Sequence, residues 1–324
     1  TTVESGDGLE GDIIEVLEGL QEADVEIQED GSALLGPAPE MVMSSEFGEN
    51  LADILSDNEL GRIYIDLVGS IESDRSSRED WEKTYTDGLK YLGMRFDETR
   101  SEPFEGASGV IHPLLGEAVT QFQAQAYKEL LPAGGPVKTQ VVGAYDSTIE
   151  EQAQRVREFM NYQIVHVMEE YDEDLDQMLF YLPLAGSAFK KVYYDENLQR
   201  PVSKFIAPED LIVPYYTTDL ESCPRITHLI KMPENDVRKL QAIGFYKRTD
   251  LEPGEEPNNY SSLDTEKEKL EGIEPSAGSD EVCVLYEVHC NLDLEGFEDV
   301  DENGEETGVK LPYIVTIDST TENI

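Results

Sequence analysis

The sequence predicts a mixed α+β fold that combines long helices with β-hairpins. Apolar residues recur at helical spacing from about residue 59 to residue 182. After residue 188, short segments rich in β-branched and aromatic residues follow, separated by turn residues. Helices and strands do not alternate regularly, which argues against a doubly wound parallel sheet.

The composition excludes several classes of function. The 324 residues include 70 Asp and Glu but only 24 Lys and Arg, which gives a formal net charge of -46. Electrostatic binding of DNA, RNA or anionic lipid over the whole chain needs an excess of cations, so this composition excludes it. Apolar residues make up 39% of the chain, below the usual ~45–50%, so part of the chain is expected outside any core. No apolar run approaches the ~20 residues of a membrane span, and we expect no membrane contact.

The cysteines and the chain ends bear on the cellular setting. Cys223, Cys283 and Cys290 have no CxxC spacing, which favours free thiols in a reducing cytosol over disulfides or a zinc site. The chain begins at Thr1 without a signal-peptide pattern and stops at Ile324 without an element that closes a fold. We therefore expect a protein that is not secreted, with residues missing at both ends.

Charge and composition divide the chain into four regions. These are an acidic, largely disordered arm (1–58), an α/β body (59–248), an acidic exposed excursion (249–279) and a β-hairpin region (280–324). Residues 1–61 contain no Lys or Arg, so self-repulsion opposes a core there. Within the arm, residues 12–20 combine capping-box spacing with one apolar helical face. This pattern fits either a transient helix or a short helix that docks on a partner.

The first part of the body is expected to be helical. One helix begins near Glu59, and a second contains Trp81 and ends at Gly93. A third begins at Pro113, and its wide apolar face is expected to be packed. That face consists of Leu114, Leu115, Ala118, Val119, Phe122, Ala126, Leu130 and Leu131. The longest periodic segment covers residues 147–182, with a capping box at its start and a bend near Tyr171.

Strands are expected after the helices. Residues 188–195 and 202–206 flank a turn and predict a hairpin, and residues 225–231 predict a further strand. Residues 233–243 predict a short helix. Residues 282–292 and 309–317 predict paired strands across an acidic turn.

One turn resembles a calcium-binding loop. Asp299, Asp301, Asn303 and Gly304 match the first half of such a loop. Lys310, however, stands at the twelfth position, where a bidentate Glu belongs. A structural hairpin turn is the favoured interpretation.

A glycine-rich loop, Gly106 to Gly109, precedes a predicted helix and could direct backbone N–H groups at a phosphate. No P-loop Lys follows it, and Val110 stands where a nucleophile elbow has its last Gly. The favoured interpretation is a tight turn that leads into a packed helix.

A cluster of acids lies along one predicted helix: Glu169, Glu170, Asp172, Glu173, Asp174 and Asp176. A two-metal nuclease or a catalytic carboxylate pair needs carboxylates that converge from different elements. Because these acids surround a single helix, a solvated face is the favoured interpretation.

The histidines show no metal-ligand or paired spacing; they are His112, His166, His228 and His289. No set of residues matches the nucleophile, base and orienting group of a hydrolase. We therefore predict a non-enzymatic protein with no catalytic, cofactor-binding or metal-ligating residue.

Basic residues gather in the second half of the body. They are Lys190, Lys191, Arg200, Lys204, Arg225, Lys231, Arg238, Lys239, Lys247 and Arg248. Pairing with acids of the same chain is one interpretation. Pairing with a neighbouring subunit, or an approach to phosphate, is the other, and both remain open.

Three stretches resemble the portal proteins of tailed bacteriophages, particularly those of short-tailed phages. They are residues 103–143 (PFEGASGVIHPLLGEAVTQFQAQAYKELLPAGGPVKTQVVG), 176–195 (DQMLFYLPLAGSAFKKVYYD) and 200–215 (RPVSKFIAPEDLIVPY). Residues 81–93 and 232–246 fit as well, so the resemblance spans about residues 80–317. It consists of long contiguous strings and includes no catalytic signature.

The resemblance implies a structural subunit of a ring, usually of twelve copies, that replaces a pentamer at one capsid vertex. DNA enters the head through the ring channel and later leaves through it. The implied partners are the major capsid protein, the scaffold, the terminase, the tail adaptor proteins and double-stranded DNA that passes without sequence specificity. The implied location is the virion, and the host cytoplasm during assembly.

Portal proteins of this family have wing, stem, clip and crown regions, and some have a helical barrel. The chain is short for all of these. The resemblance implies that its mixed body corresponds to the wing, with the C-terminal strands leading toward the stem and clip. The crown and barrel are expected to be missing.

Two other classes of function stay open. An acidic scaffold or DNA mimic would occupy the basic groove of a nucleic-acid-binding partner, as a monomer or dimer. A carboxylate-metal nuclease would cleave DNA with divalent ions and would lose this activity when Asp172 and Asp176 become Asn. The portal interpretation instead predicts large rings with a central hole and no turnover.

Overall fold

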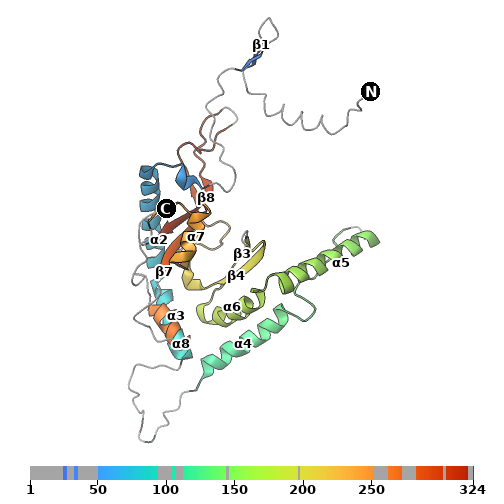
Figure 1. The fold of residues 1–324 in the computed structure, drawn as a ribbon. Helices are drawn as coiled ribbons and strands as arrows, with labels where there is room; N and C mark the ends of the chain where they lie inside the picture. The colour runs from blue at the N-terminus through green and yellow to red at the C-terminus, as the bar shows by residue number, and fades with distance from the viewer. Residues whose placement is uncertain are drawn as a thin grey trace. The chain divides into compact units, whose positions relative to one another are not determined.

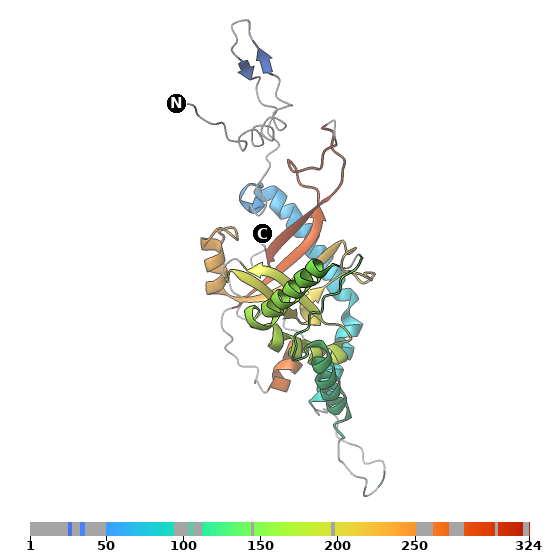
Figure 2. The same cartoon turned by 90° about the vertical axis from the view of Figure 1, so that its right-hand side faces the viewer.

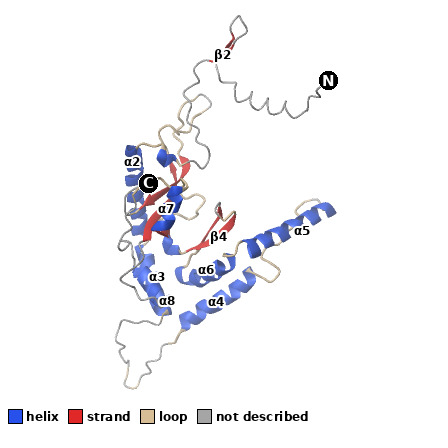
Figure 3. Ribbon diagram, viewed as in Figure 1, coloured by secondary structure: helices blue, strands red, loops and turns tan. Residues whose placement is uncertain are grey.

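The computed structural model confirms a mixed α and β fold (Figures 1 and 3). It describes residues 25–27, 33–35, 50–93, 104, 106, 112–143, 146–195, 198–250, 262–271, 282–301, 304–319 and 324. The chain divides into two units, residues 50–291 with 312–324, and residues 1–49 with 292–311. The helix predicted over residues 12–20 lies outside the described residues.

The smaller unit contains short β structure. β1 (Val25–Ile27) and β2 (Ala33–Leu35) pair antiparallel within the region predicted to be a disordered arm. In residues 292–311, an isolated bridge joins Val300 to Glu306. Sequence periodicity did not indicate β1 and β2, because each has only three residues.

The larger unit begins with two helices joined end to end. Ordered structure is present before the predicted boundary at residue 59: Asn50 caps the short 3₁₀ turn η1 (Leu51–Asp53). α2 (Asp57–Ser77) starts with a capping box in which Ser56 and Glu59 exchange hydrogen bonds. α3 (Glu79–Leu92) follows and ends at Gly93, as predicted.

Helix α8 (Ser262–Glu271) corrects the prediction of an exposed excursion over residues 249–279. Leu263 is buried in one core cluster with Tyr85 and Leu89 of α3. Lys267 pairs with the buried Glu209. Apolar contacts and a charge partner therefore hold this part of the segment against the body, although its overall composition is polar.

The predicted long helix over residues 147–182 is two helices. α5 (Ser147–Tyr162) continues into a five-residue π-helical turn, η2 (Gln163–Val167), and α6 (Tyr171–Ala185) begins after a break. The break falls at residues 168–170, which confirms the bend predicted near Tyr171. α4 (Leu114–Leu130) lies alongside α6 (Figures 1 and 2).

The strands form two sheets in the larger unit. β3 (Phe189–Asp195) and β4 (Arg200–Ile206) make the predicted hairpin, with Phe189 opposite Ile206 and Asp195 opposite Arg200. The second sheet has the order β5-β6-β7-β8. Its strands are β5 (Leu211–Ile212), β6 (Arg225–Pro233), β7 (Val282–Leu292) and β8 (Leu311–Asp318). The 3₁₀ turn η3 (Pro208–Asp210) joins the two sheets, and the predicted short helix is α7 (Glu234–Ala242).

Two arginines join the N-terminal helices to the sheet region. Arg78, at the α2–α3 junction, donates hydrogen bonds to the carbonyl oxygens of Glu209 at 2.6 Å and Leu211 at 2.9 Å. Arg225 of β6 binds the buried Asp74 carboxylate through two nitrogens, at 2.6 and 2.7 Å. A planar guanidinium can satisfy several fixed acceptors at once, so these contacts set the position of α2 and α3.

Candidate subunit-assembly surface

Helix α5 exposes an apolar stripe. Val156, Phe159 and Met160 are 50%, 62% and 44% exposed, and Ile149 lies two turns before Val156 at matching helical spacing. No residue of α5 is buried. A helix stripe of this kind is normally packed against another element, but among the described residues no element covers this stripe.

One extended segment holds α5 along a single edge. Asn161 accepts a hydrogen bond from the Val137 N–H at 2.9 Å and donates one to the Val137 carbonyl at 3.2 Å. Thr139 donates to the Ala153 carbonyl at 3.0 Å. Gly135 has φ of +88° and leaves the space that the Asn161 amide occupies. These polar contacts orient α5 without covering its apolar stripe.

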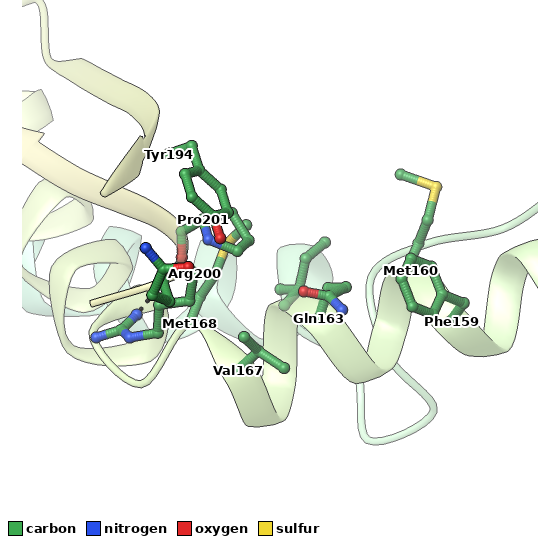
Figure 4. Close-up of a pocket in the computed structure, with 10 residues that line it drawn as sticks. Phe159, Met160, Gln163, Val167, Met168, Tyr194, Arg200 and Pro201 are labelled. Atoms are coloured by element: carbon green, nitrogen blue, oxygen red, sulfur yellow. Dashed lines mark hydrogen bonds between the residues drawn. The ribbon is translucent and has the colours of Figure 1, made fainter. Parts of the chain in front are cut away.

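A groove of about 630 Å³ lies between the end of α5, η2 and the β3–β4 hairpin (Figure 4). Phe159, Met160 and Val167 line its helical side, and Tyr194 and Pro201 line its hairpin side. Tyr194 is itself exposed. The groove therefore extends the apolar surface of α5 onto the hairpin.

Glu170 positions the hairpin beside the α5–α6 joint. Its carboxylate accepts a hydrogen bond from the Ser203 N–H at 3.0 Å and pairs with Arg200 at 2.7 Å. Burial opposes ionisation of Glu170, but hydrogen bonds from its own backbone N–H, from the Ser203 N–H and from Arg200 outweigh it, so the pKa of the carboxyl is lowered. Glu170 is therefore ionised at neutral pH and holds the β3–β4 hairpin beside the α5–α6 joint.

Helix α4 also has an uncovered face, which corrects the expectation that its apolar face is packed. Val119 is the buried residue of the helix, and it lies on the side that faces α6 and α3. Leu114, Phe122 and Leu130 are 67%, 41% and 50% exposed. The apolar face of α4 is wider than one packed helix can cover, so part of it remains open to solvent in the single chain.

The acids of α6 do more than form a solvated face. Asp174 accepts a hydrogen bond from the Phe205 N–H at 2.7 Å. Asp176 accepts one from Gln123 at 2.8 Å, and Asp172 accepts one from the Tyr127 hydroxyl. The acids therefore fasten α6 to β4 on one side and to α4 on the other. Across the described residues, no three His, Cys, Asp or Glu side chains are placed to hold a metal ion.

Most of the basic residues singled out above pair with acids of the same chain. The pairs are Lys191–Glu287, Arg200–Glu170, Arg225–Asp74, Arg238–Glu234, Lys239–Asp236 and Lys247–Asp57. Lys190 instead lies 3.8 Å from the centre of the Tyr171 ring. For these residues the structure supports the intrachain interpretation.

Three basic residues near the apolar stripe were not singled out in the sequence: Lys138, Arg155 and Arg157. None of them pairs with an acid in the part of the chain that the structure describes. Whether a charged side chain pairs with an acid depends on the tertiary structure, so the sequence did not indicate that these three are unpaired.

The histidines lie in different places, and two of them join a polar cluster. His112 and His166 are exposed. On β6 and β7, His228 lies opposite Glu287, which pairs with Lys191 and, at 2.9 Å, with His289. Burial, and then the nearby Lys191, lower the pKa of His228 to about 4. Despite burial, hydrogen bonds from His289 and Lys191 lower the pKa of Glu287 to about 2.

The calcium-like loop forms a closed turn. Asp299 accepts a hydrogen bond from the Thr307 hydroxyl at 2.5 Å, and Asp301 accepts one from the Glu305 N–H at 2.9 Å. Its oxygens thus serve the turn, in agreement with the structural interpretation. Asn303 lies outside the described residues, as do residues 107–109 of the glycine-rich loop.

All three cysteines are free thiols: Cys283 and Cys290 are buried, and Cys223 is half-buried. Burial raises the pKa of the Cys290 thiol to about 11. A thiol with such a pKa stays protonated at neutral pH, which suits a packing role.

Comparison with known proteins gives no family assignment. No model of a protein family matches the chain, and the search of curated proteins finds no significant relative. Among the described helices, none has the length and apolar character that a membrane crossing requires.

Proposed function

We propose that this chain is the structural subunit of a bacteriophage portal, a ring of about twelve copies at one capsid vertex. DNA passes through the ring channel during packaging and ejection. The terminase, the tail adaptor proteins, the major capsid protein and the scaffold are the proposed partners. The ring is a component of the virion and assembles in the host cytoplasm.

The observation that carries the proposal is the uncovered apolar surface of α4 and α5. α5 buries no residue and α4 buries one. A subunit designed to stand alone would hide these side chains in a core, whereas a ring subunit hides them against its neighbours. Assembly through several apolar faces is therefore the property that best accounts for them.

The placement of the resembling stretches supports the same proposal. Residues 103–143 include α4, residues 176–195 run from α6 into β3, and residues 200–215 include β4 and β5. In the structure α4 contacts α6, α6 contacts β4, and β3 pairs with β4. The three stretches thus pack against one another, which agrees with their forming one structural building block.

A structural role without turnover agrees with the side-chain contacts. Glu170 and Asp174 receive hydrogen bonds from β4, and Asp172 and Asp176 receive them from α4. Each of these carboxylates has a packing partner that explains its position. The proposed protein therefore acts by assembly, and chemistry on the DNA belongs to its partners.

The proposed passage of DNA sets a limit on what the charge can do. At physiological salt a charge is screened over about 8 Å, so only acids that line the channel act on the duplex. The net charge of -46 is therefore no evidence for a channel by itself. Acidic channel walls would keep the DNA from sticking while it moves.

Electron microscopy tests the proposal directly. We expect negative-stain images of the purified full-length chain to contain rings with a central hole. A chain that stays monomeric at high concentration would contradict the proposal. So would divalent-ion-dependent DNA cleavage that is lost in the Asp172→Asn, Asp176→Asn double variant. A monomer or dimer that binds basic proteins tightly would favour the acidic scaffold or DNA mimic.

A further inference from the structure

We propose that the α5 face of one copy docks on the α4 face of the next copy, in a head-to-tail contact. The α5 face is defined by Ile149, Val156, Phe159 and Met160 with the adjoining groove residue Tyr194. The α4 face is defined by Leu114 and Phe122 with the exposed Ala118, which lies on the same side of the helix. This inference rests on the proposed function and specifies which surfaces join the subunits of the ring.

The two faces belong to different parts of the subunit. α4 lies along α6, whereas α5 projects beyond the α4–α6 pair (Figures 1 and 2). Because the faces differ, a contact between them is heterologous and leaves one free face at each end of a chain of subunits. Repeated contacts of this kind close into a ring when the rotation between neighbours allows it.

The exposed apolar area has the size that such a contact needs. Five large apolar side chains on the α5 face and two on the α4 face are between 41% and 67% exposed. Each therefore offers on the order of 100 Å², so the two faces together offer on the order of 700 Å². A standard interface buries about 1,600 Å² in total, of which roughly 900 Å² is apolar. The two faces together supply most of that apolar area.

The charges around the two faces are complementary. Arg155 and Arg157 flank the apolar stripe of α5 and Lys138 lies beside the helix, and none of the three forms an ion pair with any residue that the structure describes. The exposed acids of α5, Glu150, Glu151 and Glu158, lie farther around the helix from this stripe. Exposed acids lie around α4 and on the neighbouring α6: Glu117, Glu129, Asp172, Glu173 and Asp176. Lys128 is the one base among the exposed residues of α4. In a chain with a net charge of -46, the edges of the stripe that carry Arg155 and Arg157 are thus places where the acids around α4 of a second copy meet positive charge.

The groove gives the α5 face a concave end. The groove is lined by Phe159, Met160 and Tyr194, and its volume of about 630 Å³ leaves room for a large apolar side chain of a partner. Hot spots of interfaces commonly consist of such an anchor in an apolar pocket. A neighbour that presents Phe122, the aromatic residue of the α4 face, is complementary in this respect.

Complementation between two variants of the full-length chain tests the contact. Phe159→Glu places a charged side chain in the α5 face and blocks its contact, and Phe122→Glu does the same to the α4 face. Because both side chains are exposed, each variant is expected to fold like the wild type, as circular dichroism would verify. Each variant alone is expected to lose ring formation and to weaken self-association about 100-fold or more. An equal mixture restores one intact contact per pair and is expected to give 1:1 dimers in sedimentation velocity.

Matched controls separate this contact from the general effect of added negative charge. Ile65→Glu on α2 and Ile314→Glu on β8 change exposed apolar residues elsewhere (69% and 66% exposed), and rings are expected to persist. If Phe159→Glu or Phe122→Glu misfolds, Val156→Glu or Leu114→Glu replaces it in the same design.

The outcomes distinguish this inference from the proposed function. Rings that persist in both variants would overturn the assignment of the faces and leave the ring itself intact. A mixture that stays monomeric would also overturn it, since that result indicates a contact between like faces or elsewhere. A wild-type chain that forms no assembly would overturn the proposed function.

Discussion

Acidification should weaken the larger unit through His228, which lies in the polar cluster that links the hairpin to the second sheet. The ring faces Lys191 of β3 and Glu287 and His289 of β7, and its Nδ1 is buried without a hydrogen-bond partner among the described residues. Burial is the main cause that lowers its pKa to about 4. Because the folded pKa lies below the usual unfolded value of about 6.5, unfolding takes up a proton as the pH falls. Stability is therefore present above pH ~6.5 and is lost as the pH falls toward 4.

The size of the effect follows from the same pKa values. His228 has a pKa of about 4 in the folded protein and about 6.5 in the unfolded chain. Between pH 7 and pH 5 this difference lowers the free energy of unfolding by at most about 2 kcal/mol. His228 is only half-buried, so solvent screening reduces the expected loss to about 1 kcal/mol. Glu287, with a pKa of about 2, loses its stabilising charge only below pH ~4.5 and contributes little in this window.

Urea unfolding of the wild type and of His228→Gln at pH 7 and pH 5 measures the effect. The expected result is that the variant loses about 1 kcal/mol less than the wild type over this interval. His112→Gln, at an exposed position, controls for the loss of a histidine as such. Equal pH dependence of His228→Gln and wild type would refute the assignment of acid sensitivity to His228.

Three further predictions concern assembly and packing. Ring formation should strengthen as the salt concentration rises through the low range, because screening reduces repulsion between acidic copies. Rings that instead dissociate as salt rises, measured by sedimentation velocity, would indicate a mainly ionic interface. Gly135→Ala should lower thermal stability by about 1–3 kcal/mol, since the new Cβ would lie 2.5 Å from the Asn161 Cγ at positive φ. Gly134→Ala, with no atom within 4 Å of the new Cβ, should be neutral. Asp74→Asn should cost about 3 kcal/mol in urea unfolding because it leaves a partly buried arginine without its carboxylate. Asp57→Asn, whose carboxylate is 99% exposed, should change stability little, and equal losses would contradict the burial argument.

Local patterns predicted the helices and hairpins well. Gly93 ends α3 as predicted, and the bend near Tyr171 is the break between η2 and α6. The β3–β4 hairpin has the predicted strands within two residues. These features depend on residues close in sequence, such as caps, turn residues and apolar spacing, so one chain suffices to indicate them.

Patterns were less informative where distant residues decide the outcome. The acids at and before the start of α6 have the composition of a solvated face, but backbone N–H groups of β4 and side chains of α4 bind four of them. α8 lies in a polar stretch, but Leu263 is buried against α3. Neither partner lies within helical spacing of the residue it contacts, so no local rule connects them.

The amino-acid order alone determined the fold class, the order of helices and strands apart from β1, β2, β5 and α8, and the apolar character of the α4 and α5 segments. Only the tertiary structure decided which of those apolar residues are covered. Val119 is enclosed by neighbouring helices, whereas Phe122 and Phe159 remain in contact with solvent. An apolar side chain favours burial, but the geometry of the packed chain decides whether the chain itself or a second molecule buries it.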